Sequence, residues 1–453
     1  MLSKTYELVV IGGGFPGMYA AWRAAELGMD VLLLESSSRL GGVLNPIRWK
    51  NFTVDQGTHN IDLRRSATRR FFEDLYREEM LKKSSFDFAS VNNSNWTYGI
   101  EQPDFSFDLE FSSAIERDLL SIQRGAPDQT ESVSLVGHYQ GKYGASITRH
   151  YRNLLEAKFG VQSVDGISSD SSRVLSFLER PKVFSDQKSV ELKCLSSFWD
   201  ERIGCTRSVA DIYFKDDSKD GYFGYPKYMA DRDFNALALA MLKRHGVEIR
   251  LDEKVVGLDF ASLCPVVQTA DNAFCASRIL WTLPHNLLVN LAGEASQKQN
   301  KPQIIGARLD VFEVPLKSIR GPDYVVDYDL SRRAYRYNNQ GLYSDQITDD
   351  GSTFIVAESY FDASSPDASA ISKEGIWSDA QAIGFIESGS RYVDTIDFNI
   401  GVGMALAQVS PYEYIQEEGI GDSRVISLPS KFRGRDAFVG YFEKVLLPIL
   451  SGP

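Results

Sequence analysis

Cysteine and histidine are scarce in this chain. The 453 residues include four cysteines, and no two of them form a Cys-x-x-Cys pair. That spacing is typical of metal clusters and of disulfide relays, so we expect free buried thiols and no metal site. The four positions are Cys194, Cys205, Cys264 and Cys275. With only five histidines, few side chains are available to carry a proton near neutral pH.

Long apolar runs are absent as well. No stretch approaches the ~20 apolar residues that a membrane-spanning helix needs, and the first apolar run is too short for a signal peptide. We therefore expect a cytoplasmic protein. The net charge of −12 disfavours nucleic acid and anionic membrane surfaces as main partners. A small molecule is the expected partner, and a homodimer is left open.

The clearest motif lies in the first 35 residues. Apolar residues 8–11 predict a buried strand, a helix-period stretch covers 16–27, and a second apolar strand covers 31–34. Between the first strand and the helix, three glycines stand in G-x-G-x-x-G spacing: Gly12, Gly14 and Gly17. This order of elements is a β-α-β unit with the fingerprint of dinucleotide-binding proteins.

Each position of the motif has a physical role. Gly12 permits a tight turn, Gly14 lets a pyrophosphate approach the backbone, and Gly17 lets the helix pack closely on the strand. The helix N-terminus offers free N–H groups and a partial positive charge to phosphates. Glu35, at the end of the second strand, can accept hydrogen bonds from a ribose diol.

Two further turns follow this unit directly. Arg39-Leu40-Gly41-Gly42 comes after Glu35, and Asp55-Gln56-Gly57-Thr58-His59 comes after that. An arginine suits a diphosphate, and glycines suit a place where a flat ring contacts the backbone. The arrangement resembles the flavoprotein superfamily that includes amine oxidases, protoporphyrinogen oxidase, phytoene desaturases and UDP-galactopyranose mutase.

The resemblance implies FAD as the cofactor in place of NAD. In that superfamily the R-x-G-G turn runs beside the pyrophosphate and the flavin, and the D-x-G-x-H stretch passes near the isoalloxazine ring. Later segments also match, namely a return strand ending in Thr-x-Pro and a Gly-Arg turn before a C-terminal helix. The implied cofactor contacts are Gly12, Gly14, Phe15, Pro16, Gly17, Glu35, Ser36, Arg39, Gly41, Gly42, Val43, Gly57, Thr58, His59, Val255, Thr282, Gly434 and Arg435.

The fold class that we expect is α/β. A Rossmann-like FAD-binding domain, with a central parallel sheet and a β-meander, is interleaved with an α+β substrate domain that contains an antiparallel sheet. The expected boundaries are 1–83, 225–300 and 425–453 for the first domain, and 84–224 and 301–424 for the second. Periodicity predicts helices over 64–83, 146–158, 169–179, 231–245, 368–385 and 436–450, and a strand over 105–111.

Three side chains are candidates for catalysis. His59 is placed by its motif at the flavin, where it can act as an acid or base or donate a hydrogen bond. Arg433 or Arg435, with the helix N-terminus that follows, can stabilise negative charge on a reduced flavin. A structural role for His59 and surface salt bridges for the two arginines are equally open.

The hypothesis that we favour is an FAD-dependent oxidoreductase, in which hydride passes from a small-molecule substrate such as an amine to flavin N5. A second hypothesis is a non-redox enzyme similar to UDP-galactopyranose mutase, acting on a sugar nucleotide. A third is a degenerate flavin-binding protein, because the family's glycine pair, which follows Tyr-Pro and one further residue, is replaced by the bulkier Tyr228 and Met229. The sequence does not identify the substrate or the electron acceptor.

Overall fold

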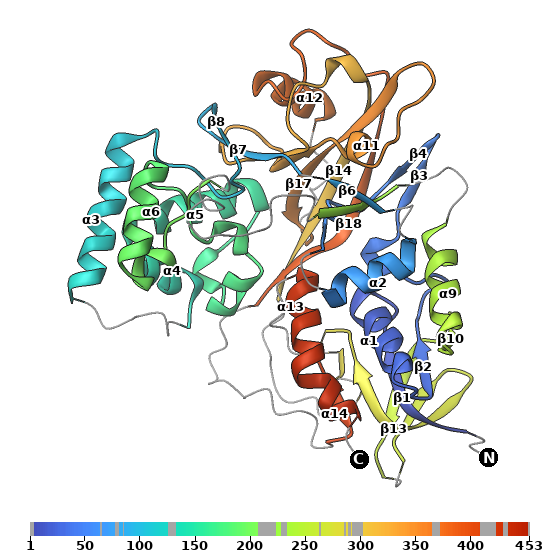
Figure 1. The fold of residues 1–453 in the computed structure, drawn as a ribbon. Helices are drawn as coiled ribbons and strands as arrows, with labels where there is room; N and C mark the ends of the chain where they lie inside the picture. The colour runs from blue at the N-terminus through green and yellow to red at the C-terminus, as the bar shows by residue number, and fades with distance from the viewer. Residues whose placement is uncertain are drawn as a thin grey trace. The chain divides into compact units, whose positions relative to one another are not determined.

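The computed structural model divides into two compact units (Figure 1). The first unit comprises Met1–Lys83, Phe223–Gln299 and Tyr412–Pro453, and the second comprises Ser84–Tyr222 and Asn300–Pro411. The structure describes residues 4–63, 66–77, 81–84, 86–125, 133–206, 223–227, 233–261, 264–284, 287–288, 291, 302–364, 372–407, 423–428 and 434–451. Within these ranges no helix is long and apolar enough to cross a membrane.

A seven-stranded sheet forms the centre of the first unit. Its order is β10-β2-β1-β13-β12-β11, and β19 also pairs with β13. Strands β10, β2, β1, β13 and β19 are parallel, while β11, β12 and β13 form an antiparallel meander. The prediction of a parallel sheet with a meander is therefore confirmed. The strands are β1 (Thr5–Ile11), β2 (Val31–Leu34), β10 (Glu248–Arg250), β11 (Val255–Asp259), β12 (Val266–Thr269), β13 (Ala273–Trp281) and β19 (Val425–Ser427).

Helices cover this sheet. The strands β1 and β2 are buried on both faces, and their sequences are nearly continuous apolar runs. The helices are α1 (Phe15–Glu26), α2 (Ser66–Tyr76), α9 (Phe234–Arg244), α13 (Gly434–Tyr441), a π-helical turn η9 (Phe442–Leu446) and α14 (Leu447–Ser451). The C-terminal helices α13 and α14 are the last in the sequence, but they lie against α1, the first helix of the chain (Figure 1). Short elements complete the unit: η1 (Gly42–Leu44), β3 (Ile47–Trp49), β4 (Phe52–Val54), β5 (Ile61–Asp62), β6 (Leu81–Ser84) and β9 (Phe223–Pro226).

The helix predicted over 64–83 is shorter than expected. It ends at Tyr76, because Arg77 adopts a left-handed conformation with φ of 59° and breaks the helical hydrogen bonding. Leu81–Ser84 forms the strand β6, which pairs in a small sheet of order β5-β9-β6. The helix that the amphipathic spacing predicted is therefore present only in the first part of the segment.

The second unit is built on a seven-stranded sheet of order β18-β14-β17-β16-β15-β7-β8. All neighbours are antiparallel except β15 and β7. The helix α12 (Lys373–Ala382) packs on one face through Ile376 and Trp377, against Phe312 and other apolar side chains. The strands are β7 (Phe88–Asn92), β8 (Asn95–Tyr98), β14 (Gln303–Pro315), β15 (Tyr324–Asp327), β16 (Arg336–Asn338), β17 (Ser352–Asp362) and β18 (Asp394–Leu406).

A group of helices precedes most of that sheet in the chain. They are α3 (Leu109–Gly125), α4 (Leu135–Tyr143), α5 (Ala145–Phe159), α6 (Asp186–Leu195) and α7 (Ser197–Asp200), with the short α11 (Gln340–Tyr343) between strands. The helix predicted over 146–158 is confirmed as α5, and Gly160 ends it in a left-handed conformation.

Three other expectations need correction. The predicted strand over 105–111 is wrong, since α3 begins at Leu109 and the Asp108 carboxylate accepts from the Phe111 N–H, as a helix cap does. The predicted helix over 169–179 is two short 3₁₀ turns, Ser169–Arg173 and Ser176–Leu178. None of the four cysteines forms a disulfide, but only Cys275 is buried, and Cys194 is exposed.

Candidate cofactor site

The first glycine turn in the first unit requires glycine for steric reasons. Gly12 has φ of 106°, and a Cβ there would lie 2.5 Å from Thr282 Oγ1. A Cβ on Gly17 would overlap the carbonyl oxygen of Gly12. At Gly14, by contrast, a Cβ would meet nothing nearer than 3.9 Å. Gly12 and Gly17 therefore bring strand and helix together, and Gly14 leaves open space next to the turn.

The start of α1 is suited to an anion. Its N-cap residue is Gly14, no side chain caps the free N–H groups, and the first turn contains no acidic residue. Pro16 stands near the start, where its missing N–H costs nothing. A phosphate at this helix end would receive backbone hydrogen bonds and the favourable end of the helix dipole.

Glu35 lies immediately after β2, at the carboxyl end of the parallel strands. Its Oε2 accepts from the Gly13 N–H at 2.6 Å, and its Oε1 accepts from the Ser37 N–H at 2.8 Å. The Ser36 hydroxyl lies 3.3 Å from Oε1. The Glu35 N–H donates to the Arg250 carbonyl at the end of β10, and its carbonyl accepts from the Glu253 N–H in the loop after β10. Val255, which opens β11, follows that loop with a partly buried side chain. Glu35 is thus anchored where a nucleotide's ribose would lie in a doubly wound fold.

A second glycine turn lies against the first. The Gly41 N–H donates to the Gly13 carbonyl at 2.8 Å, and Gly14 and Gly41 form an isolated parallel bridge. Gly41 has φ of 111°, and a Cβ on it would overlap the Phe234 ring. Val43, in the η1 turn that follows, is 54% exposed. The backbone of the two turns is therefore brought side by side at positions where neither residue has a side chain, Gly14 and Gly41.

Arg39 is fixed beside these turns by the start of α9. Its Nη2 donates to Asp233 Oδ1 at 2.5 Å and to Asn45 Oδ1 at 3.2 Å, and the side chain is 47% exposed. Asp233 also caps α9, and the Asn235 side chain accepts from the Leu40 N–H. We did not predict Asp233 or Asn235 as site residues, although an Asp-x-Asn sequence before an apolar helix is a capping signal.

The stretch that contains His59 runs beside the second glycine turn. His59 Nε2 lies 3.0 Å from the Val43 carbonyl oxygen, and Gln56 Nε2 donates to the Asn45 carbonyl at 2.7 Å. Gly57 has φ of 111°. The Thr58 hydroxyl is buried and has no hydrogen-bond partner among the described residues. A buried hydroxyl in this state is a group that a ligand or a water can satisfy.

The C-terminal helix meets this stretch through Arg435. Arg435 Nη2 donates to the Asn60 carbonyl at 2.8 Å, and the guanidinium lies 5.7 Å from the centre of the Phe72 ring. Gly434 is the first residue of α13. Arg433 lies outside the described residues. The structure therefore brings His59 and Arg435 to the same short segment, 59–60.

Two predicted cofactor contacts have side chains that belong to the scaffold. Phe15 is 7% exposed, and its ring packs against Phe71 and Phe72 at centroid distances of 5.5 and 5.6 Å. Thr282 directly follows β13, and its hydroxyl donates to the Ile11 carbonyl at 2.7 Å. Both hold the first glycine turn from behind.

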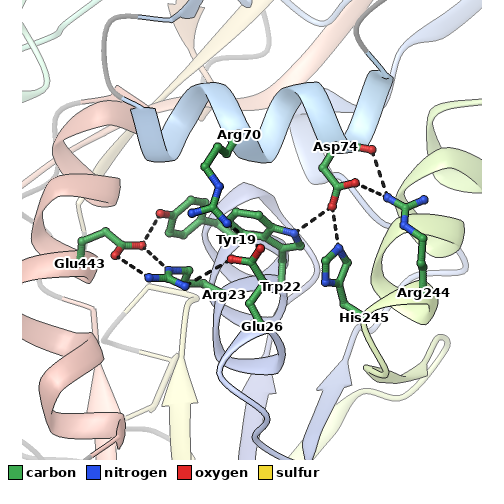
Figure 2. A network of polar contacts seen from close by, with 9 residues as sticks. All are labelled: Tyr19, Trp22, Arg23, Glu26, Arg70, Asp74, Arg244, His245 and Glu443. Carbon is green, nitrogen blue, oxygen red and sulfur yellow. Dashed lines mark hydrogen bonds and ion pairs between the residues drawn. The ribbon is translucent and has the colours of Figure 1, made fainter.

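A polar network that the sequence did not suggest fastens three elements to α1 (Figure 2). Glu443, in the π-helical turn, accepts from the Tyr19 hydroxyl at 2.6 Å and from Arg23 Nε at 3.0 Å. On the other side of α1, Asp74 of α2 accepts from the Trp22 indole at 3.0 Å. Asp74 also bonds Arg244 and His245 at the end of α9, with His245 Nε2 at 2.7 Å. The helix that carries the candidate phosphate site is thereby tied to α2, α9 and the C-terminal helices.

Comparison with known proteins finds relatives that include a flavin-containing enzyme. A model of the NAD(P)-binding Rossmann-like domain matches residues 10–75. Coproporphyrinogen III oxidase from Propionibacterium freudenreichii is 37% identical over 69 residues, 15% of this chain and 13% of that protein. A probable flavin-containing monoamine oxidase A from Dictyostelium discoideum is 25% identical over 112 residues, 22% of this chain and 25% of that protein. The chain thus matches a quarter or less of the length of these curated relatives.

Solved structures extend the similarity to most of the chain at the level of the fold. Reduced UDP-galactopyranose mutase matches with a TM-score of 0.64 and 13% identity, over 89% of this chain and 85% of that one. A variant of putrescine oxidase matches with a TM-score of 0.51 and 14% identity, over 87% and 84%. The Dictyostelium relative is named as flavin-containing, and the Rossmann-like model covers the glycine motif, which agrees with the prediction of FAD. The chain therefore has the fold of the FAD-dependent amine oxidase-like superfamily.

Proposed function

We propose that this protein is an FAD-dependent oxidoreductase that moves hydride from a small-molecule substrate to flavin N5. The observation that carries the proposal is the pair of bridged glycine turns at Gly14 and Gly41, set at the uncapped start of α1. Glu35 lies beside them and Arg39 is fixed close by. Bound FAD supplies the two-electron acceptor, and the protein's part is to hold it and the substrate.

Different residues of the first unit contact different parts of the bound cofactor. The N–H groups of α1 and the Arg39 guanidinium bind the pyrophosphate, and the Glu35 carboxylate accepts from the ribose hydroxyls. The start of α13 and Arg435 place positive charge beside segment 59–60, where it stabilises an anionic cofactor ring. His59 donates to or accepts from substrate or cofactor after exchanging its contact with the Val43 carbonyl.

The absorption spectrum of the purified full chain tests the proposal. We expect the bands of oxidised flavin, bleaching with anaerobic dithionite and returning in air. A substrate of the oxidoreductase should bleach the same bands without dithionite. A colourless protein that cannot be reconstituted with FAD would overturn the proposal.

A second candidate is a non-redox activity similar to that of UDP-galactopyranose mutase. The observation in its favour is the TM-score, which is higher for that enzyme, at 0.64, than for the putrescine oxidase variant, at 0.51. A mutase of this kind should need prior reduction of its flavin and leave it reduced after turnover. Turnover of UDP-galactopyranose only after dithionite treatment would therefore favour the mutase over the oxidoreductase.

A further inference from the structure

The strand β8 lies at one edge of the second unit's sheet. It is last in the strand order, and it follows β7 after the two-residue turn 93–94, in which both residues have positive φ. A turn of this kind makes the residues on either side of it, Asn92 and Asn95, a hydrogen-bonded pair. Bonding to β7 alternates from there along β8. The backbone N–H and C=O groups of Trp96 and Tyr98 therefore point away from the sheet.

The outer edge of β8 is open. The Gly99 N–H donates to the Phe88 carbonyl at 2.8 Å, which agrees with the alternation. Among the described residues, no backbone group bonds to the outward groups of Trp96 and Tyr98. Tyr98 is 61% exposed, and its ring stacks on that of Trp96 at a centroid distance of 5.8 Å. An edge with unpaired backbone groups can accept an extended segment as an added strand.

A pocket of about 440 Å³ adjoins this edge, and Asn92 and Asn95 both line it. Side chains alternate along a strand, so Asn95 and Thr97 share the face opposite to that of Tyr98. The Thr97 hydroxyl donates to Asp104 Oδ2 at 2.8 Å, and Asp104 also lines the pocket. The pocket therefore lies on the Asn95 and Thr97 face. Its volume is within the range of about 300–1,000 Å³ that is typical of ligand sites.

The pocket presents hydrogen-bond acceptors and an aromatic ring. Asn92 is 9% exposed; its Nδ2 donates to the Asp104 carbonyl at 2.9 Å, and its Oδ1 has no partner among the described residues. Asp108 Oδ1 accepts from the Phe111 N–H at 2.9 Å, and Asp108 Oδ2 has no partner within the same part of the chain. The Phe107 ring, also in the lining, is 54% exposed. A ligand must therefore donate hydrogen bonds and cover an aromatic surface.

The charge of the pocket favours a cation. Lys182 Nζ lies 3.0 Å from Asp104 Oδ2, and both side chains are buried, so these two charges compensate each other. Lys182 Nζ also lies 5.9 Å from the centre of the Phe107 ring. The Asp108 carboxylate remains as the net charge of the lining, and the whole chain carries a net charge of −12. A guanidinium is a flat cation with several N–H donors that stacks on aromatic rings, whereas a carboxylate or a phosphate dianion has no proton to donate.

We propose that β8 and this pocket bind an extended segment of a partner protein that carries an arginine. The segment pairs with the free backbone groups of Trp96 and Tyr98, and the guanidinium enters the pocket to contact Phe107 and Asp108. Because side chains alternate along the added strand, the residues on either side of the arginine lie on the Tyr98 face, where apolar side chains fit. This inference goes beyond the proposed function and does not depend on it, since the second unit alone carries the surface.

Fluorescence anisotropy on the full chain tests the proposal with a labelled heptapeptide, Val-Thr-Val-Arg-Val-Thr-Val. We expect saturable binding, and about tenfold weaker binding or less when citrulline, a neutral analogue of similar shape, replaces the arginine. Two further peptides carry N-methyl groups, one on the valines and the other on the threonines and the arginine. In an added strand only one of these two sets of N–H groups faces β8, so only one of the two peptides should lose binding.

Variants of the protein test the pocket itself. Asp108→Asn keeps the cap of α3, because asparagine caps helices as well as aspartate does, and it should weaken binding of the arginine peptide by about tenfold. Phe107→Ala should weaken it by about threefold. Glu110→Gln is the matched control, since Glu110 is an exposed acid in the first turn of α3 and does not line the pocket.

Three results would overturn the proposal. The first is that the arginine peptide does not bind saturably. The second is that Asp108→Asn and Phe107→Ala bind this peptide as Glu110→Gln does, with circular dichroism showing that all three are folded. The third is that both N-methylated peptides bind as the parent peptide does. The flavin spectrum is a separate measurement, so a failure here leaves the proposed function standing, and a colourless protein that binds the peptide leaves this inference standing.

Discussion

The substitution Gly17→Ala tests whether this glycine is needed for the close packing of α1 on β1. A Cβ there would overlap the Gly12 carbonyl oxygen, so α1 must move away from β1. The N–H groups of α1 then no longer converge on one phosphate position. We expect Gly17→Ala to weaken FAD binding by about tenfold or more, which corresponds to roughly 1.4 kcal/mol of binding free energy.

Fluorescence titration of the apoprotein with FAD measures this effect. Gly125→Ala is the matched control, since a Cβ on Gly125 meets nothing within 4 Å. Equal FAD affinity of Gly17→Ala and Gly125→Ala would contradict the assignment of Gly17 to close packing of helix and strand.

His150 in the second unit makes stability depend on pH. Burial lowers the pKa of His150 to about 4, and its ring packs against Phe105 and Phe111 with no hydrogen-bond partner for Nε2 among the described residues. Between the ordinary pKa of 6.5 and about 4, the unfolded chain binds a proton that the folded chain does not. The free energy of unfolding should therefore fall as the pH falls through this window, by about 3 kcal/mol in total.

Urea unfolding of the wild type and of His150→Leu at several pH values checks this prediction. The difference in unfolding free energy between the two proteins should be constant above pH 6.5 and change between pH 6.5 and 4. It should be constant again below pH 4, where both states of the wild type are protonated. Parallel pH profiles for the two proteins would show that folding does not change the pKa of His150.

At the scale of elements, the C-terminal helices depend on Glu443 for their attachment to α1 (Figure 2). Glu443 accepts from Tyr19 and Arg23, and it lies in a π-helical turn whose extra residue shifts the helix face. In Glu443→Gln the negative charge is lost, and the amide N–H groups face the Tyr19 hydroxyl and the Arg23 guanidinium, which are themselves donors. We expect the free energy of unfolding to fall by about 1–3 kcal/mol.

Tyr19→Phe removes one of these hydrogen bonds and should cost about 1 kcal/mol. Lys444→Gln, at the exposed neighbouring position, is the control. Chemical unfolding of the three variants measures the differences. If Glu443→Gln is as stable as Lys444→Gln, the network in Figure 2 does not stabilise the C-terminal helices.

Local signals account for what the sequence predicted correctly and for what it missed. The strands β1 and β2 and the glycine turn have their own steric requirements, and the helix before Gly160 has its own C-cap, so each could be identified without tertiary information. The alternating apolar residues over 105–111 led to the wrong prediction of a strand, because the capping of α3 by Asp108 outweighs period-two spacing. The Glu443 network joins residues more than 400 positions apart, and no local pattern encodes it.

At the scale of the whole molecule, two units with separate cores should respond differently to the cofactor. FAD is expected to bind the first unit, whose sheet carries the glycine turns, and a ligand present at a hundredfold excess over its Kd stabilises its binding domain by about 2.7 kcal/mol. Calorimetry should therefore show two unfolding transitions. Saturating FAD should raise the temperature of one of them, and Gly17→Ala should reduce that shift. A single transition that moves as a whole would show that the two units unfold together.

The order of strands in the first unit also has a consequence for synthesis of the protein. β1 pairs with β13 some 270 positions later, and β19, at residues 425–427, completes the parallel part of the sheet. A ribosome adds roughly 5–20 residues per second, so the first glycine turn waits about 20 s or more for its last partners. During that interval the turn is made but not supported from behind by Thr282, and segment 59–60 lacks its contact with Arg435. Stable capture of the cofactor is therefore an event of the finished polypeptide and not of the nascent chain.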